Sequence, residues 1–244
     1  MARNTSDGYP EATWVETHPG NFSRGRSSGV TGGLTHIVLH TCEGPADVCL
    51  ESLTRDRTGE SKHSAHYLVT KEGSVFQLVA ESDTAWHSGP PNSAYTQFAV
   101  GELLHGVEVQ KPMPNYNPNS IGIEIEGYAD NDDTWTPELV ESLGQLLRYL
   151  TLKYKIPLVY RDQNTNARGG DPALAVPARP KGIVSHGTLD PARRYDPGWF
   201  FPWEDVKTAA LWDSRAPGAA RPTWPVAGIG LLLLGGLAWV SSQR

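Results

Sequence analysis

Three side chains that can bind a metal or polarise a reacting group lie in one short stretch, 181–199: His186, Arg194 and Asp196. Imidazole and carboxylate are both good zinc ligands, and a catalytic zinc needs three protein ligands and one open position. Because His186 and Asp196 are ten positions apart, they cannot form an i, i+4 pair on one helix, and the loop between them has to fold back. The stretch indicates a metal site whose third ligand lies elsewhere; the plainer alternative is a surface loop with a lone histidine and a capping aspartate.

An earlier segment offers candidates for the third ligand. Residues 35–40, THIVLH, alternate as a strand does, with Ile37 and Leu39 on one face and the two histidines on the other. His40 ends this strand and faces away from the apolar side, so it is well placed as the missing ligand. His36 lies two residues earlier on the same face and is the main competitor.

A second strand, 120–128, carries carboxylates. Its isoleucines form one face, and Glu124 and Glu126 lie on the other. Two carboxylates on so apolar a strand imply that this second face meets water or a polar cleft. A solvated face is the alternative interpretation, and it applies more readily to Glu126, because Glu124 lies deeper in the strand.

Two segments are predicted to be helices that support these strands. Residues 46–57 would place Val48 and Leu53 on an inward face. The second helix begins after Thr136, a good N-cap residue, and its leucines repeat at helical spacing. We therefore expect this second helix to pack on the sheet and to carry no chemistry.

A turn at Lys71-Glu72-Gly73 separates two apolar segments, 64–70 and 74–79, which is typical of a β-hairpin. Strands and helices otherwise alternate along the chain. The pattern predicts an α/β domain with a central mixed β-sheet flanked by helices over residues 34–210, preceded by a polar N-terminal arm, residues 1–33.

The C-terminal part has a different composition. A Pro- and Ala-rich linker, 211–224, leads into an uncharged apolar stretch, 225–242, with Trp224 and Trp239 near its ends. Length and hydropathy predict a C-terminal hydrophobic helix that spans a membrane. A buried terminal helix is the alternative, which the internal glycines of the stretch disfavour.

The net charge of −6 and the pI of about 5.7 argue against nucleic acid as a partner. The first residues contain no apolar core, so we expect no ordinary N-terminal signal peptide. Cys42 and Cys49 suit a local disulfide if the domain works outside the cytoplasm; buried thiols are the alternative.

Five motifs, taken in order, resemble those of the zinc-dependent N-acetylmuramoyl-L-alanine amidases, a family that includes phage endolysins and peptidoglycan recognition proteins. The motifs are HIVLHT, SAHYLVTKEGSVFQLV, AWHSG, SIGIEIEGY and VSHGTLDPARRYDPG. The resemblance implies Zn²⁺ in a surface groove that accepts peptidoglycan. It also implies hydrolysis of the amide bond between N-acetylmuramic acid and L-alanine.

Carried over residue by residue, the resemblance implies the zinc ligands His40, His186 and Asp196. Some relatives have a cysteine at the third of these positions. Here Asp196 takes that place, as in the bacterial recycling amidases.

The resemblance also implies two catalytic residues. One branch of the family has a tyrosine where this chain has Ala65, so proton transfer should fall to Glu124. Arg194 stands where relatives often keep a lysine, and we expect it to stabilise the developing oxyanion. A guanidinium is a planar fork rather than a point charge, so the contact it makes differs in detail.

Substrate contacts are expected from His66, Trp86 and His87, which would line the groove. The alternative is that the two histidines are structural and are satisfied by backbone groups. We expect a membrane-associated enzyme at the host cell envelope, acting on the cell wall as a phage-type lysis enzyme. Two other functions stay open: a module that binds peptidoglycan without cutting it, and a membrane-anchored envelope or virion protein.

Overall fold

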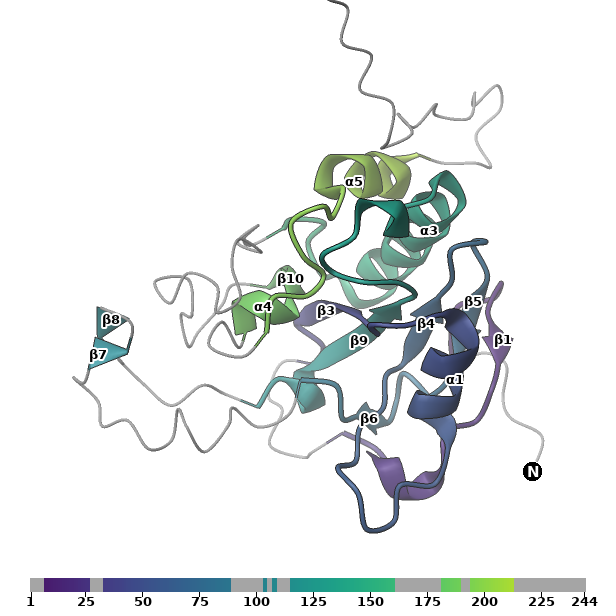
Figure 1. Ribbon diagram of the computed structural model, residues 1–244. Helices are drawn as coiled ribbons and strands as arrows, with labels where there is room; N and C mark the ends of the chain where they lie inside the picture. The colour runs from purple at the N-terminus through teal and green to yellow at the C-terminus, as the bar shows by residue number, and fades with distance from the viewer. Residues whose placement is uncertain are drawn as a thin grey trace, which may run out of the picture.

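A computed structural model describes residues 7–26, 33–88, 103–104, 107–108, 115–160, 181–189 and 194–212. These residues build a six-stranded sheet with helices on both faces (Figure 1). The strands, in spatial order, are β1 (Thr13–Trp14), β5 (Val75–Gln77), β4 (Tyr67–Val69), β9 (Ser120–Ile125), β3 (His36–Thr41) and β10 (Gly182–Ser185).

Helices and short strand pairs complete the described fold. The α-helices are α1 (Ala46–Thr54), α3 (Pro137–Tyr154), α4 (His186–Leu189) and α5 (Trp203–Leu211). Short 3-10 helices cover η1 (Pro19–Asn21), η2 (Asn117–Asn119) and η3 (Asp132–Thr134). Two antiparallel pairs lie outside the main sheet: β2 (Phe22–Ser23) with β6 (Thr84–Ala85), and β7 (Leu103–Leu104) with β8 (Val107–Glu108).

The sheet is mixed, as the sequence predicts. β4 and β5 form the expected antiparallel hairpin, whereas β4, β9, β3 and β10 run parallel to one another. The predicted helix after Thr136 is α3, and the Thr136 side chain accepts a hydrogen bond from the backbone N–H of Leu139. Of residues 90–119, the structure describes only 103–104, 107–108 and 115–119.

One face of the sheet holds the main hydrophobic core. The isoleucines of β3, β9 and β10 pack there against the leucines of α3 and against α5 (Figure 1). The alternation in the sequence accounts for this face, because every second residue of each strand points to it. The opposite face is therefore left for α1 and for the polar residues of the strands.

Helix α1 covers part of that opposite face, but with a different phase from the predicted one. Leu53 is buried as expected, whereas Val48 is 53% exposed, so its predicted inward position is wrong. Cys49 takes the inward place, four residues before Leu53 on the same side of the helix. Cys49 is also bonded to Cys42 in a disulfide that joins α1 to the end of β3.

The N-terminal residues belong to the domain, and the predicted boundary after residue 33 needs correction. β1 pairs with β5 at the edge of the main sheet, and β2 pairs with β6. Arg26 donates hydrogen bonds to the carbonyl oxygens of Glu81 and Ser120. An edge strand such as β1 joins the sheet through backbone hydrogen bonds. The polar side chains of this segment therefore do not reveal the strand in the sequence.

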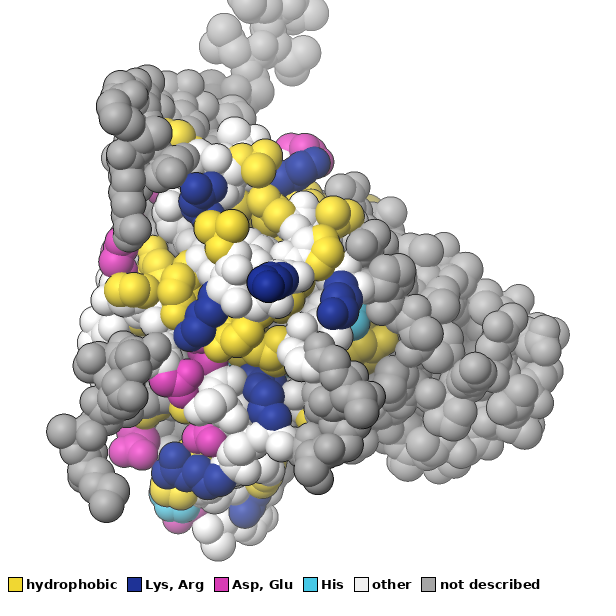
Figure 2. All heavy atoms as spheres, turned by 180° about the vertical axis from the view of Figure 1, so that it is seen from behind, with side chains coloured by type: hydrophobic (Ala, Val, Ile, Leu, Met, Phe, Trp, Pro, Cys, Tyr) yellow, Lys and Arg dark blue, Asp and Glu magenta, His cyan; other side chains and the backbone are white. Residues whose placement is uncertain are grey.

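The predicted tail, 225–242, and nearly all of the linker lie outside the described residues. Among the helices of the described ranges, none has both the length and the apolar character that a bilayer-crossing segment needs. Seen from behind, the described surface carries Lys and Arg side chains among apolar, acidic and uncharged groups (Figure 2).

Packing of α3 on the sheet gives a first prediction. Leu146 is fully buried, whereas Leu152 on the same helix is 68% exposed. We expect Leu146→Ala to lower the free energy of unfolding by about 2–5 kcal/mol, because it leaves a cavity. Leu152→Ala is the matched control and should change it by less than about 0.5 kcal/mol. Chemical denaturation of both variants measures this, and equal losses would contradict the packing described.

Candidate functional site

Parallel pairing brings polar residues from distant parts of the sequence into one row. In the register of the sheet, His40 lies opposite Glu124, and Glu124 lies opposite Leu68. On the other side of β3, Ser185 pairs with Leu39, so His186 follows directly beside His40. The row lies on the face of the sheet that α3 does not cover.

Asp196 reaches this row from the loop after α4. Its backbone carbonyl oxygen accepts a hydrogen bond from the Gly187 N–H at 2.9 Å, which ties the loop to the start of α4. Pro197 and Gly198 follow, and the Asp196–Pro197 peptide bond is cis. The fold-back that the sequence required between His186 and Asp196 is therefore present, and both side chains are buried.

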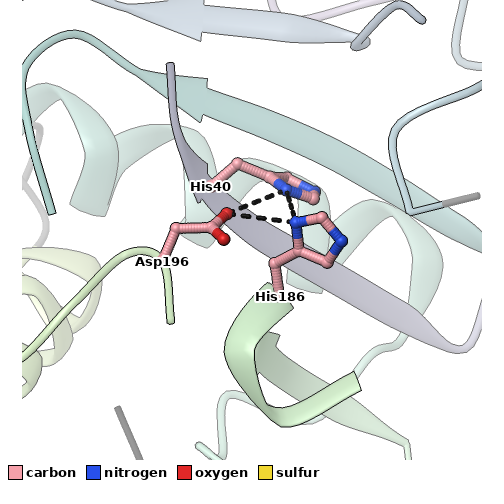
Figure 3. Close-up of side chains that lie close together, drawn as sticks. All are labelled: His40, His186 and Asp196. Carbon is pink, nitrogen blue, oxygen red and sulfur yellow. Dashed lines mark hydrogen bonds and ion pairs between the residues drawn. The ribbon is translucent and has the colours of Figure 1, made fainter. Parts of the chain in front are cut away.

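The three predicted ligands meet at one point (Figure 3). The Nδ1 atoms of His40 and His186 are 3.0 Å apart. The Asp196 Oδ2 atom lies 3.3 Å from the first of these nitrogens and 3.1 Å from the second. The competing candidate, His36, lies at the opposite end of β3, where its ring packs against Tyr116.

The donor atoms fit a zinc ion in both chemistry and spacing. Zinc binds imidazole nitrogen and carboxylate oxygen at about 2.0–2.2 Å in tetrahedral sites. Two ligands of such a site are about 3.4 Å apart, as follows from those bond lengths. The separations here of 3.0–3.3 Å come close to that value. Three buried groups that turn lone pairs toward one another are stabilised by a shared cation, so this set can hold a metal.

The electrostatics of the set point the same way. Burial, together with neighbouring His186, lowers the pKa of His40 to about 4, so this imidazole is neutral and its lone pair is available. Burial alone would raise the pKa of Asp196, but neighbouring His186, through its charge and its hydrogen bond, opposes this rise, and the pKa lies well below its usual range. A neutral imidazole and an ionised carboxylate are the forms that bind metal.

Glu124 is the polar residue next to this set. Burial raises its pKa to about 8, the Asp196 carboxylate adds to the rise, and Arg194 opposes it. The buried Oε2 atom of Glu124 has no hydrogen-bond partner among the described residues. A buried carboxyl oxygen without a partner is costly to keep, and such atoms are typical of catalytic sites.

A cavity of about 550 Å³ opens in front of these residues. Arg194 is exposed at its wall, so it is brought to the same space as Glu124 and the ligand set. His63 and Lys62 also line the cavity, although neither is among the residues predicted from the sequence. They could have been found because they directly precede the SAHYLV motif. Further lining residues are Thr41, Glu43, Ser52, Ser61, Ser64, His87, Ser88 and Tyr195.

Two of the three predicted substrate contacts need correction. His66 is fully buried; its Nδ1 atom accepts the Gly122 N–H at 3.0 Å, and its Nε2 atom lies 3.2 Å from the Asp83 carbonyl oxygen. It therefore has the structural role that was the alternative. Trp86 donates its Nε1–H to Ser23 Oγ and lines a separate, smaller hollow.

His87 and Glu126 have distinct surroundings. His87 lines the main cavity but is 8% exposed, and its Nδ1 atom lies 3.1 Å from Nε2 of His40. The Glu126 carboxylate accepts the backbone N–H groups of Ala46 and Lys71, at 3.0 and 2.7 Å. Glu126 thus fixes the start of α1, as a carboxylate at a helix N-terminus does, and lies outside the cavity wall.

Comparison with known proteins agrees with this arrangement. The sequence profile of the Amidase_2 family, described as N-acetylmuramoyl-L-alanine amidase, matches residues 31–199. The chain belongs to this family. The matched range contains every residue of the metal-ligand set and Glu124.

Two curated relatives and one solved structure are similar to this amidase-family chain. N-acetylmuramoyl-L-alanine amidase A of Achromobacter lyticus is 26% identical over 199 residues, covering 81% of this chain and 92% of that protein. The 1,6-anhydro-N-acetylmuramyl-L-alanine amidase AmpD of Haemophilus influenzae is 29% identical over 141 residues, covering 58% and 55%. A crystal structure of a selenomethionine AmpD derivative shares the fold, with a TM-score of 0.55 at 20% identity, covering 86% of this chain and 99% of that one.

The ligand set gives a second prediction. Removing the hydrogen-bond partner of a metal ligand typically weakens metal binding by about 10- to 100-fold. Removal of the ligand itself should cost more, so we expect His40→Ala to weaken zinc binding by more than about 100-fold. His36→Ala, two residues earlier on the same strand, is the matched control and should bind zinc as the wild type does. Competition with a chromophoric chelator measures both affinities. Tight binding by His40→Ala would remove this residue from the site.

Proposed function

We propose that this chain is a zinc-dependent enzyme that hydrolyses the amide bond between the lactyl group of N-acetylmuramic acid and L-alanine in peptidoglycan. The observation that carries the proposal is the convergence of His40, His186 and Asp196 beside Glu124 in an open cavity. Family membership supports the substrate class, since the family is that of the N-acetylmuramoyl-L-alanine amidases.

Zinc bound by the three ligands would supply Lewis-acid chemistry, polarising the scissile carbonyl and lowering the pKa of a water to about 7. Both histidines would bind through Nδ1 and Asp196 through Oδ2, the atoms that face one another. Three protein ligands would leave one position of a catalytic zinc free, and the cavity in front of them would admit the substrate.

Glu124 moves the proton. It takes a proton from the attacking water and releases it to the amine of L-alanine as the carbon–nitrogen bond breaks, so that a carboxylate and a free amino group result. Burial raises the pKa of Glu124 to about 8, which favours a group that can hold and donate a proton, whereas a cation beside it would favour the carboxylate that accepts one.

Arg194 stabilises the negative charge that develops on the carbonyl oxygen. Its guanidinium lies at the wall of the cavity that Glu124 and the ligands share. A fixed positive charge near the developing oxyanion stabilises the transition state more strongly in a partly closed site than in water.

The proton-transfer role gives a third prediction. We expect Glu124→Gln to lower kcat by about 10²- to 10⁴-fold while zinc content and binding to purified cell wall are kept, because glutamine cannot carry the proton. Mass spectrometry of digested peptidoglycan measures the release of stem peptides that begin with L-alanine. Glu126→Gln is the matched control on the same strand, and its turnover should stay close to that of the wild type.

The result of that assay also separates the proposal from its rivals. Wild-type protein that binds the wall and zinc but releases no peptide would favour a binding module. Full turnover by Glu124→Gln would refute the role given to Glu124 and leave the metal site standing. Loss of turnover after removal of zinc by a chelator, restored by added zinc, is the result we expect for the wild type.

We also propose that residues 225–242 anchor the enzyme to a membrane, where it acts on the adjoining cell wall. The support is the uncharged composition of this segment and the tryptophans near its ends. The Cys42–Cys49 disulfide supports work in an oxidising compartment. A phage-type lysis role fits such an anchored wall hydrolase and stays a prediction.

The anchor gives a fourth prediction. Deleting residues 223–244 should move the protein from the membrane fraction to the soluble fraction without loss of amidase turnover, because the cavity and its ligands all precede the deletion. Fractionation and the peptide-release assay measure the two effects. A truncated protein that is folded but inactive would show that the segment is not a separable anchor.

A further inference from the structure

A chain of four hydrogen-bonding groups runs from the metal-ligand set to the backbone. The Ser120 hydroxyl donates to the Tyr116 carbonyl oxygen at 2.6 Å. Ser120 Oγ lies 3.0 Å from His87 Nε2, and His87 Nδ1 lies 3.1 Å from His40 Nε2. The side chains of Ser120, His87 and His40 are all buried.

The direction of each proton in this chain follows from the number of protons available. A serine hydroxyl carries one proton, and the short contact to Tyr116 uses it, so Ser120 Oγ accepts from an N–H at His87 Nε2. A neutral imidazole protonated at Nε2 has its lone pair on Nδ1. That lone pair of His87 accepts an N–H from Nε2 of His40. The lone pair of His40 then lies on Nδ1, the atom that faces His186 and Asp196.

We propose that His87, oriented by Ser120, is a positioning residue that holds His40 in the tautomer able to bind metal through Nδ1. This inference rests on the proposed function, because it concerns the metal centre of that site. A hydrogen-bond partner on the second nitrogen of a ligating histidine fixes both the tautomer and the orientation of the ring. Here a second histidine does so, where a carboxylate or a carbonyl oxygen would be usual.

The packing around the His87 ring is a separate observation in favour of this role. A Cβ atom at position 122 would lie 2.3 Å from Cγ of His87, so the ring occupies space that only a glycine leaves open. The backbone of His87 is held as well, because Asn117 Oδ1 accepts its N–H at 3.2 Å and that of Ser88 at 2.8 Å. The His87 ring is packed against Gly122, and its backbone is bonded to Asn117. A side chain fixed in this way is better suited to orienting the metal ligand His40 than to contacting a variable substrate.

The test measures zinc affinity of the full-length protein and of its variants by competition with a chromophoric chelator. We expect His87→Leu, which keeps bulk but removes the acceptor, to bind zinc about 10- to 100-fold more weakly. His87→Asn keeps a polar acceptor at the δ position and should recover most of the affinity. His63→Leu is the matched control, because His63 lines the same cavity but bonds to Ser52, and its zinc affinity should not change.

A second readout does not depend on zinc. In metal-free protein with ¹⁵N-labelled histidine, the nitrogen chemical shifts should show both His40 and His87 protonated at Nε2. In Ser120→Ala the acceptor for His87 is gone, so His40 should become a mixture of tautomers and bind zinc more weakly. If circular dichroism shows that His87→Leu does not fold, the smaller substitution Ser120→Ala tests the role of His87 instead.

The outcomes separate this inference from the function it rests on. Absence of zinc binding by the wild type overturns the metal centre and the inference together. Equal zinc affinity of wild type, His87→Leu and Ser120→Ala overturns the inference alone. A proton on Nδ1 of His40 in the metal-free wild type also overturns it.

Discussion

The in-register parallel pairing of β9, β3 and β10 is the constraint on which the site depends. It places Glu124, His40 and His186 in one row on one face, with the apolar core on the other. Because side chains alternate along a strand, a shift of one residue would turn a whole strand's polar residues into the core. The isoleucines therefore do more than stabilise the fold: by demanding burial, they fix the register that brings the ligands together.

Burying so many polar groups in one place has a cost, and the surrounding residues offset it. The second nitrogen of His40 is bonded to His87, and the Glu126 carboxylate holds the start of α1. The Cys42–Cys49 disulfide ties that helix to the strand that carries His40. These contacts hold the frame to which the loop with Asp196 contributes the third donor group.

The parts of the fold that depend on short-range periodicity could be predicted from the sequence. The alternation in 35–40 and 120–128 predicts which face each residue takes, and the mixed sheet follows. What failed depends on tertiary packing. Nothing local distinguishes Val48 from Cys49 as the inward residue of α1. Nothing local distinguishes His66 from His87 either, because both are buried histidines. Only the partners of their ring nitrogens separate a structural histidine from one that contacts the candidate ligand set. The edge strand β1 was missed for a similar reason, since it joins the sheet through its backbone.

The central claim is that one zinc ion binds to the three facing donor atoms. The most direct measurement is an anomalous difference map at the zinc edge from crystals of the zinc-loaded protein. We predict a single strong peak about 2.0–2.2 Å from Nδ1 of His40, Nδ1 of His186 and Oδ2 of Asp196. A peak bound through other atoms, or none at this position in a protein that hydrolyses peptidoglycan, would contradict the account.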